Sequence, residues 1–349
     1  MLVINSRFLT QNITGVQRFA IEISKQLKEL YQDNIEFVSP KNVKHKSLAN
    51  ELNVKIIGNK TGHLWEQIDL PKYLKQRGNP LLLNLANTAP YLYKNKIITL
   101  HDVAFIRFPQ TFNWKFRLFY KLLIPNIIKS SKYIITVSEF SKKEIMKFYK
   151  LRSSEITVVY NAPANIFKKI KTTYKDKYIL AVSSLNFQKN FYSLIKAFNL
   201  LQDKNIKLYL VGGFNKNFAN VELIKAINSN KNIIFKGRVD DEKLVKLYSN
   251  AICFVYPSLY EGFGIPPLEA QACGCPVIVS NVASLPEVCK DSALYCNPYD
   301  IDDIKEKIEI LVKDENLQKE LIKKGFENIK RFSWEESAKK IISLIKGLK

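Results

Sequence analysis

The chain has 349 residues, of which 46% are apolar and 25% charged, and its 54 lysines and arginines outnumber 32 acidic residues for a net charge of +22. This composition excludes a disordered or fibrous protein, and the length suggests two domains of ordinary size. No stretch reaches the ~18–20 apolar residues that cross a bilayer, and we find no signal peptide. We therefore expect a soluble, intracellular protein whose positive charge points to nucleic acid, a membrane surface or an anionic substrate.

The first half of the chain alternates short β-branched runs with longer amphipathic stretches, a pattern typical of parallel sheets flanked by helices. It predicts helices at Val16–Leu30 and Trp114–Lys129. The expected strands are Leu2–Asn5, Leu81–Leu85, Ile97–Leu100, Ile134–Val137 and Ile156–Val159. A lysine-rich stretch without apolar periodicity then extends to Lys177 and is the expected interdomain linker.

The same alternation of short β-branched runs and longer amphipathic stretches begins again in the second half of the chain. The expected strands are Tyr178–Val182, Lys207–Val211, Ile233–Lys236, Ala251–Val255 and Pro276–Ser280. The expected helices are Tyr192–Leu201, Val221–Ser229, Asp241–Ser249, Pro267–Cys273, Asp302–Lys313, Leu317–Ile329 and Trp334–Lys349. We therefore expect domains at 1–163 and 164–330, and a terminal helix in 331–349 that packs back toward the first domain. Two doubly wound units imply a ligand cleft at the carboxyl ends of the strands.

The five cysteines lie between Cys253 and Cys296, and none forms a CxxC pair. Cys273 and Cys275 have no second pair of cysteines or histidines nearby to complete a zinc site. The chain has only three histidines, so a multi-histidine metal centre is also not expected. The pattern favours free thiols packed in a reduced, cytosolic core.

A glycine-rich loop follows the strand ending near Tyr256 and reads YEGFGIPPLEA over residues 260–270. Its glycines let a ligand approach the backbone, and Pro267 suits the first turn of a helix. A loop of this kind that leads into a helix N-terminus can hold an anion, although an ordinary strand-to-helix turn is the alternative. Glu261 and Glu269 are suited to binding sugar and ribose hydroxyls on either side of a diphosphate.

The segment EGFGIPPLEAQACGCPVI, which contains both glutamates, resembles the donor-binding signature of the retaining GT-B glycosyltransferases of family four. Similar text occurs at residues 136–141, 158–161, 232–239, 282–288 and 332–335, so the resemblance covers nearly the whole chain. It implies an α/β protein with the GT-B fold, in which two Rossmann-like, doubly wound parallel-sheet domains face a central cleft. The first domain would bind the acceptor and the second the nucleotide-sugar donor.

By that resemblance, Glu269 holds the donor ribose and Glu261 the hydroxyls of the transferred sugar. The backbone amides of four consecutive residues would contact this sugar and its phosphate: Gly262, Phe263, Gly264 and Ile265. Lys189 and Asn190 match the family's phosphate loop, but Gln188 stands where arginine is common. We expect Lys189 to bind the β-phosphate, with a solvated lysine at a helix start as the alternative.

The remaining assignments also follow from the resemblance. On the donor side, Gly212 would let the chain turn beneath the donor, and Arg238 and Val239 would flank the nucleobase. Gly15 and Val16 would belong to a loop under the phosphates, with a plain turn at a helix start as the alternative. His101, directly after a strand, would bind the donor sugar near the reacting carbon rather than act as a base, with a structural histidine as the alternative. Three residues are candidates for the acceptor pocket: Trp65, Asn87 and Asp102. A buried Trp65 could equally belong to the core.

We expect no metal and no other cofactor. The only Asp-x-Asp spelling is Asp300-Ile301-Asp302, and capping of the following helix explains these carboxylates better. Lys189 and a helix N-terminus would then neutralise the leaving nucleotide diphosphate in place of a metal ion.

The positive charge is concentrated in the first half of the chain. Residues 1–163 contain 25 basic and 11 acidic residues, a net of +14, and residues 164–349 contain 29 and 21, a net of +8. The expected helix Trp114–Lys129 interleaves aromatic and basic residues, which suits the interface of an anionic bilayer. A packing helix with a solvated basic face, or a general excess of lysine, is the alternative.

The resulting hypothesis is a cytoplasmic, peripheral membrane glycosyltransferase on the inner face of the bacterial cytoplasmic membrane. It would transfer a hexose, with retention of configuration, from GDP-mannose or a UDP-hexose to a polyprenyl-diphosphate-linked glycan in O-antigen or capsule synthesis. One alternative keeps the GT-B fold with a soluble acceptor, a sugar phosphate or a glucan. The other, a nucleic-acid-binding protein, lacks every expected motif, so we expect no nucleic acid partner.

Overall fold

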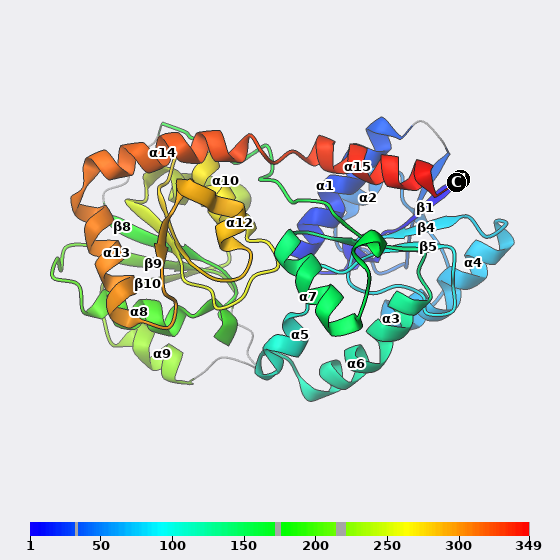
Figure 1. The fold of residues 1–349 in the computed structure, drawn as a ribbon, viewed down its shortest axis with the longest axis horizontal. Coiled ribbons are helices and arrows are strands. Elements are labelled where there is room, and N and C mark those ends of the chain that lie inside the picture. The colour runs from blue at the N-terminus through cyan, green and yellow to red at the C-terminus, as the bar shows by residue number, and fades with distance from the viewer. Residues whose placement is uncertain (32–33, 172–175, 214–220, 349) are drawn as a thin grey trace. The chain divides into compact units, whose positions relative to one another are not determined.

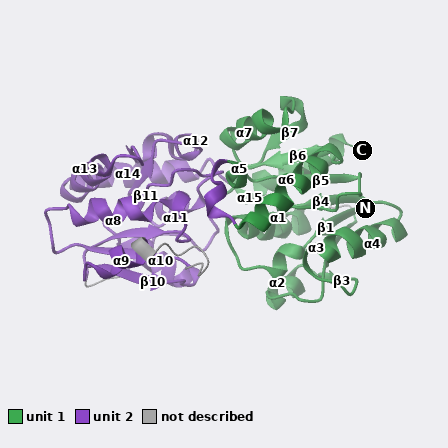
Figure 2. Cartoon of the chain, turned by 90° about the horizontal axis from the view of Figure 1, so that it is seen from below, with its two compact units in different colours: residues 1–106, 113–161, 333–349 green, residues 107–112, 162–332 purple. Residues whose placement is uncertain are grey.

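The computed structural model describes residues 1–31, 34–171, 176–213 and 221–348, and it divides into two compact units (Figures 1 and 2). Unit 1 contains residues 1–106, 113–161 and 333–349, and unit 2 contains residues 107–112 and 162–332. The unit boundaries thus fall at 161/162 and 332/333, beside the expected 163/164 and 330/331. The grouping of residues 107–112 with unit 2 was not anticipated from the sequence.

Unit 1 is built on a parallel sheet of seven strands in the order β3-β2-β1-β4-β5-β6-β7. The strands are β1 (Leu2–Asn5), β2 (Ile35–Ser39), β3 (Lys55–Ile56), β4 (Leu81–Asn84), β5 (Lys96–Thr99), β6 (Tyr133–Thr136) and β7 (Ile156–Val158). The sequence analysis missed β2 and β3. The two residues of β3 are both exposed, so this edge strand has no buried apolar pattern to reveal it.

The longer helices of unit 1 have clear sequence causes. They are α1 (Gly15–Leu30), α6 (Trp114–Lys129), α7 (Glu139–Tyr149) and α15 (Trp334–Gly347), and the shorter ones are α2 (Lys46–Glu51), α3 (Gly62–Leu64), α4 (Leu70–Gln76) and α5 (Ala104–Arg107). Asn113 caps α6 by accepting a hydrogen bond from the backbone N–H of Lys115. The helix α15 packs against α1 (Figure 1).

The core of unit 1 includes a cluster between α4 and the sheet. Val3, Val38 and Leu82 come from three neighbouring strands and pack against Trp65, Leu70 and Leu74. Trp65 begins a π-helical turn, Trp65–Asp69, that leads directly into α4. This packing fixes the segment before α4 above the sheet.

Unit 2 repeats the architecture with six parallel strands in the order β10-β9-β8-β11-β12-β13. The strands are β8 (Tyr178–Val182), β9 (Lys207–Val211), β10 (Ile233–Gly237), β11 (Cys253–Tyr256), β12 (Val277–Ser280) and β13 (Leu294–Cys296). The helices are α8 (Phe191–Asn199), α9 (Val221–Asn228), α10 (Asp241–Asn250), α11 (Ile265–Ala272), α12 (Leu285–Cys289), α13 (Ile301–Lys313) and α14 (Glu315–Ile329). Apolar residues of α8 and α13 share one core cluster with β8, β9, β11 and β12.

Both sheets reverse their strand order once. In unit 1 the chain moves outward from β1 to β3 and then restarts at β4, on the other side of β1. In unit 2 the same reversal lies between β8 and β11. The predicted fold class, two Rossmann-like doubly wound parallel-sheet domains, is therefore confirmed, and each unit has a switch point of the kind where open α/β sheets bind ligands.

Three smaller expectations also have structural outcomes. All five cysteines are free thiols in buried positions, as predicted. Asp300 is the N-cap of α13 and accepts hydrogen bonds from the backbone N–H groups of Asp302 and Asp303, which confirms its capping role. Within the described residues, no helix is both long and apolar enough to cross a bilayer.

Candidate functional site

Lys189 and Glu261 meet above the switch point of unit 2. Lys189 lies in a short 3-10 turn that follows β8, and Glu261 lies in the loop that follows β11. The Nζ atom of Lys189 donates to Glu261 Oε1 at 2.6 Å and to the hydroxyl of Tyr256 at 3.3 Å. Both charged side chains are nearly buried, with 13% and 10% exposed.

This pair keeps a buried positive charge at the switch point. Burial works to lower the pKa of Lys189, but the Glu261 carboxylate and then Tyr256 outweigh it and raise that pKa above its ordinary value. Lys189 is therefore an ammonium ion at neutral pH. Tyr256, which was not singled out from the sequence, is the missed member of this cluster, and its place at the end of a strand was the available signal.

The glycine-rich loop is held in a shape that only glycine permits. Gly264 has φ +102°, and a Cβ atom there would lie 2.6 Å from Cδ2 of Leu285. The hydroxyl of Ser284 lies 3.0 Å and 2.7 Å from the carbonyl oxygens of Glu261 and Phe263. Two residues at the start of α12 thus fix the loop directly before the N-terminus of α11.

The predicted donor-binding residues of this loop lie next to one another, between β11 and the start of α11. The residues from Gly262 to Ile265 are all buried and connect the Glu261 position to α11. Glu269 lies in α11, is 7% exposed and accepts a hydrogen bond from the Tyr248 hydroxyl at 3.5 Å.

Asn190 anchors the Lys189 turn. Its backbone is left-handed, with φ +57°, and its Nδ2 donates to the carbonyl oxygens of Pro257 at 3.1 Å and Pro298 at 2.7 Å. The backbone N–H of Leu259 also donates to the carbonyl of Gln188 at 2.8 Å. The side-chain N–H groups of Asn190 thus tie the turn that contains Lys189 to the segments after β11 and β13.

Gly212 and Arg238 lie at the ends of β9 and β10. A Cβ atom on Gly212 would lie 1.7 Å from the carbonyl oxygen of Ser183, so the chain passes this strand end too closely for any side chain. A Cβ atom on Gly213 would meet Nε of Arg238 at 2.5 Å, so the missing side chain makes room for the guanidinium. Arg238 is exposed and Val239 is half-buried.

In unit 1, His101 and Asn87 join the loops that follow β5 and β4. The backbone N–H of His101 donates to Asn87 Oδ1 at 2.9 Å, and its Nε2 lies 3.1 Å from the carbonyl of Leu85. Because a carbonyl only accepts, Nε2 carries the proton and Nδ1 is the acceptor atom of the ring. Burial lowers the pKa of His101 to about 4, partly opposed by the Leu85 hydrogen bond, so the imidazole is neutral near pH 7.

Three further predicted residues of unit 1 lie at or beside helix starts: Gly15, Val16 and Asp102. Gly15 is the first residue of α1, and the backbone N–H of Thr14 before it donates to Gln17 Oε1 at 3.2 Å. Val16 is the half-buried second residue of this helix. Asp102 Oδ1 accepts from the backbone N–H of Ala104 at 2.8 Å, at the start of α5.

Trp65 has the core position that the sequence analysis gave as its alternative. Its side chain is fully buried in the core cluster beneath α4, and its indole N–H donates to the carbonyl of Ile57 at 2.7 Å. A ring with no exposed surface and a satisfied N–H has nothing to offer a ligand.

The sequence analysis missed a buried polar cluster beside Trp65. Arg7 Nε donates to Glu66 Oε1 at 3.1 Å, and Asn5 Nδ2 donates to Glu66 Oε1 and to Asn84 Oδ1, both at 2.9 Å. Arg7 Nη2 also donates to Thr88 Oγ1 at 2.7 Å. These residues are far apart in sequence, and only the adjacency of β1 and β4 brings them together.

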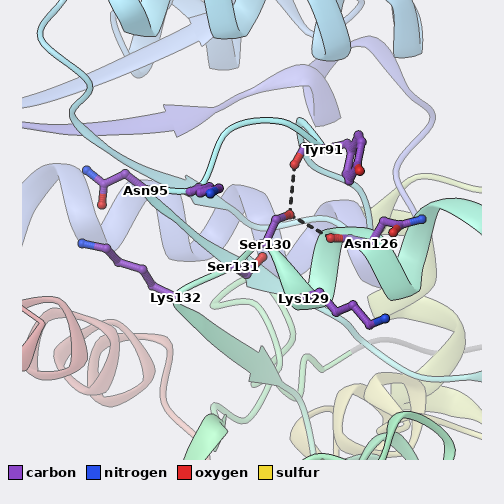
Figure 3. A pocket seen from close by; sticks show the side chains of 8 residues that line it. Tyr91, Asn95, Asn126, Lys129, Ser130, Ser131 and Lys132 are labelled. Carbon is purple, nitrogen blue, oxygen red and sulfur yellow. Dashed lines mark hydrogen bonds between the residues drawn. The ribbon is translucent and has the colours of Figure 1, made fainter.

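A cavity of about 630 Å³ lies elsewhere in unit 1 (Figure 3). It is lined by Tyr91, Lys94, Asn95, Asn126, Lys129, Ser130, Ser131 and Lys132. Ser130 Oγ lies 3.0 Å from the carbonyl of Tyr91 and 2.8 Å from that of Asn126. Dashed lines in Figure 3 mark these two hydrogen bonds. Because Lys94 precedes β5 and Lys132 precedes β6, the cavity is at the amino-terminal edge of the sheet, away from His101 and Asn87.

Two family models match the chain, one for each half. The model described as "Glycosyltransferase Family 4" matches residues 13–162, and the model described as "Glycosyl transferases group 1" matches residues 164–328. The first match ends and the second begins within two residues of the division between the units at 161/162.

Two similar proteins are bacterial. The O-antigen chain mannosyltransferase B of Escherichia coli is 31% identical over 276 residues, which cover 74% of this chain and 72% of that protein. The O-antigen chain mannosyltransferase RfbU of Salmonella typhimurium is 34% identical over 223 residues, which cover 64% of this chain and 62% of that protein. The match to RfbU therefore spans less than two thirds of its length.

A solved structure shares the fold over nearly the whole chain. HepE from Anabaena, solved in complex with UDP-glucose, superposes with a TM-score of 0.79 and 16% identity, covering 99% of each chain.

Proposed function

The chain belongs to the group 1, family 4 glycosyltransferases, and from that premise we propose that unit 2 binds the nucleotide diphosphate of a sugar donor at its switch point. The observation that carries this proposal is the buried Lys189–Glu261 pair, 2.6 Å apart beside the glycine-rich loop. The ammonium group of Lys189 would form an ion pair with the β-phosphate, while Glu261 would accept hydrogen bonds from the transferred sugar. Glu269, farther along α11, would hold the ribose.

We propose that this transfer needs no metal ion and retains the anomeric configuration. The leaving diphosphate gains negative charge as the glycosidic bond breaks, and a fixed ammonium ion and a helix N-terminus stabilise such charge. The N-terminus of α11 directly follows the glycine-rich loop. Lys189 lies beside this loop, where it donates hydrogen bonds to Glu261 and Tyr256. The departing phosphate oxygen would take the proton of the acceptor hydroxyl.

Mannose is the proposed sugar, with GDP-mannose as donor. Two of the similar proteins carry the name O-antigen chain mannosyltransferase, which favours this sugar over other hexoses. A UDP-hexose is the alternative donor, and the two differ in the base that Arg238 and Val239 would flank.

The donor proposal is tested by thermal shift and transfer assays with GDP-mannose, UDP-glucose and UDP-galactose. GDP-mannose is expected to raise Tm most, since a ligand stabilises the folded state in proportion to its affinity. Lys189→Gln should lower kcat/KM by ~10²–10³-fold, the usual effect of losing one charge-stabilising group.

Lys196→Gln is the matched control, because Lys196 lies on α8 and stacks over Tyr192 rather than entering the site. Equal activity of Lys189→Gln and Lys196→Gln would contradict the phosphate role. Activity lost in EDTA and restored by magnesium would contradict metal-free transfer.

We propose further that the acceptor is a lipid-linked glycan and that unit 1 docks on an anionic membrane through α6. Trp114, Leu118 and Leu122 recur every four residues on this helix and are 64%, 52% and 63% exposed. Residues 70–138 contain eleven basic residues and one acidic residue, Asp102, and the lysine-lined cavity of Figure 3 opens at the end of α6. An apolar stripe with a basic border suits an anionic bilayer.

A further inference from the structure

A buried polar cluster occupies the switch point of unit 1. Asn5 and Asn84 end the two strands at which the order reverses, and their side chains are hydrogen-bonded at 2.9 Å. Glu66 joins them from the π-helical turn Trp65–Asp69 by accepting from Asn5. Open α/β sheets bind ligands at such points, and π-helical turns are frequent at functional sites.

His63 connects this cluster to the surface. The Glu66 side chain is 1% exposed and that of His63 is 40% exposed, and Glu66 Oε2 lies 3.4 Å from His63 Nδ1. Burial works to raise the pKa of Glu66, but Arg7 and then the neighbouring His63 and Thr88 side chains lower it to about 2. Glu66 is therefore a carboxylate at every physiological pH. A carboxylate facing Nδ1 stabilises the proton on that atom and leaves Nε2 as the acceptor of the neutral ring.

The charges in the cluster favour a neutral ligand. Arg7 is paired with Glu66 at 3.1 Å, and its Nη2 donates to Thr88 at 2.7 Å. The cationic group is thus balanced by a carboxylate, so the cluster has no excess positive charge for a phosphate. A hydroxyl group, which donates one hydrogen bond, matches the lone pair of Nε2.

Apolar surface lies beside the imidazole. The ring of Phe119, on α6, is 4.9 Å from the ring of His63, and Phe119 and Leu64 are both exposed. Small-molecule sites commonly combine apolar contact area with a few placed polar groups. A sugar presents both features, because its ring carbons have an apolar face and its edge has hydroxyl groups.

We propose that His63, positioned by Glu66, is an acceptor-binding residue whose Nε2 accepts a hydrogen bond from a hydroxyl of the acceptor sugar. This inference rests on the proposed glycosyl transfer and adds to it a residue and the group that this residue recognises. Glu66 acts through His63 and through the strand ends, so it is a positioning residue.

The first test is a binding experiment that needs no donor. The chain has three histidines, so their imidazole signals can be resolved by NMR. Titration of the full chain with methyl α-D-mannopyranoside should shift the His63 ring signals, assigned with His63→Gln. The signals of His45, whose Nε2 lies 2.8 Å from the carbonyl of Gln11, should not move. No shift of the His63 signals up to the solubility limit of the sugar would overturn the inference.

The second test separates acceptor affinity from donor affinity. With GDP-mannose and methyl α-D-mannopyranoside as substrates, His63→Ala should raise the acceptor KM by ~3- to 10-fold, the effect of one lost neutral hydrogen bond. The donor KM should stay within about twofold, as for any loss confined to acceptor contacts. His63→Gln, whose side-chain oxygen can replace Nε2, should recover most of the affinity, and His45→Ala should match the unaltered protein.

The outcomes of the two proposals are distinguishable. An acceptor KM that is unchanged by His63→Ala, or a donor KM that rises equally, would overturn the role of His63 while leaving glycosyl transfer intact. Failure of every nucleotide sugar to bind would defeat the proposed function instead, and the NMR titration would still decide the role of His63. Because His63 is part-exposed, its variants should fold, whereas Glu66→Gln would leave Arg7 buried without its partner.

Discussion

Each unit places one nearly buried pair of opposite charges at its switch point. In unit 2 the pair is Lys189 with Glu261, and in unit 1 it is Arg7 with Glu66. Such pairs add little to stability, because the cost of removing two charges from water offsets their attraction. Both pairs lie at the edge of the sheet where open α/β folds bind ligands, and this position favours a functional explanation for both. The pairs differ in their cationic residue: Lys189 is suited to a phosphate, whereas Arg7 already donates a hydrogen bond to Thr88.

At the same scale, His101 makes the stability of unit 1 depend on pH. Its pKa is about 4 in the folded protein, against about 6.5 when unfolded, so the unfolded chain binds the proton first as pH falls. The free energy of unfolding should therefore be unaffected by this group above pH 6.5 and fall by ~2–3 kcal/mol between pH 7 and pH 4.5. Urea denaturation across this range measures the slope.

His101→Gln should flatten that slope, and His45→Gln should leave it unchanged. Only the slope is diagnostic, since the His101 substitution also alters the hydrogen bond to Leu85. Equal slopes for the unaltered protein and His101→Gln would show that the imidazole is not held neutral by burial.

At the scale of elements, agreement with the sequence depends on how strong the local pattern is. The helix Trp114–Lys129 has the predicted bounds, with Asn113 capping its start and Ile124, Ile127 and Ile128 buried near its end. The strands β2 and β3 were missed, since one is a five-residue strand with a glutamate and the other has two exposed residues. The strand β13 was also missed, since it has only three residues. The other strands differ from prediction by at most two residues at either end.

The packing of α15 against the rest of unit 1 leads to a prediction about the stability of this unit. Ile341 is fully buried on this helix, as are Ala338 and Ile345. Ile341→Ala should lower the free energy of unfolding of unit 1 by ~2–4 kcal/mol, the usual cost of emptying a buried isoleucine site. Nucleotide-sugar binding by unit 2 should stay unchanged.

Lys340→Ala is the control on the same helix, since Lys340 is exposed and should change stability by less than about 0.5 kcal/mol. Denaturation followed by tryptophan fluorescence measures both variants in unit 1, because all three tryptophans of the chain lie in this unit. A similar small effect of Ile341→Ala would mean that α15 is not tightly packed on unit 1.

For the whole molecule, the net charge of +22 is unevenly distributed, and residues 70–138 of unit 1 carry +10 of it. Co-sedimentation with vesicles of phosphatidylglycerol and phosphatidylethanolamine at low salt tests the docking of this region. Lys129→Glu with Lys132→Glu should weaken binding by at least tenfold, because each lysine near an anionic surface contributes ~1 kcal/mol and reversal adds repulsion.

The matched control is Lys319→Glu with Lys323→Glu on α14 of unit 2, which changes the net charge by the same amount. Equal losses in both double variants would mean that total charge, rather than the α6 region, governs binding. No binding of the unaltered protein would contradict membrane docking and favour a soluble acceptor.

The sequence by itself determined the two doubly wound units and the glycine-rich loop before α11, because apolar periodicity and the Glu261 to Glu269 segment are local in the chain. It also located Lys189, through its match to a family motif. Only the tertiary structure decided that Trp65 is a core residue and that Arg7, Glu66 and His63 form one cluster at the β1/β4 switch point. Strand order brings together residues about sixty positions apart, and no spacing within the chain encodes which strands become neighbours.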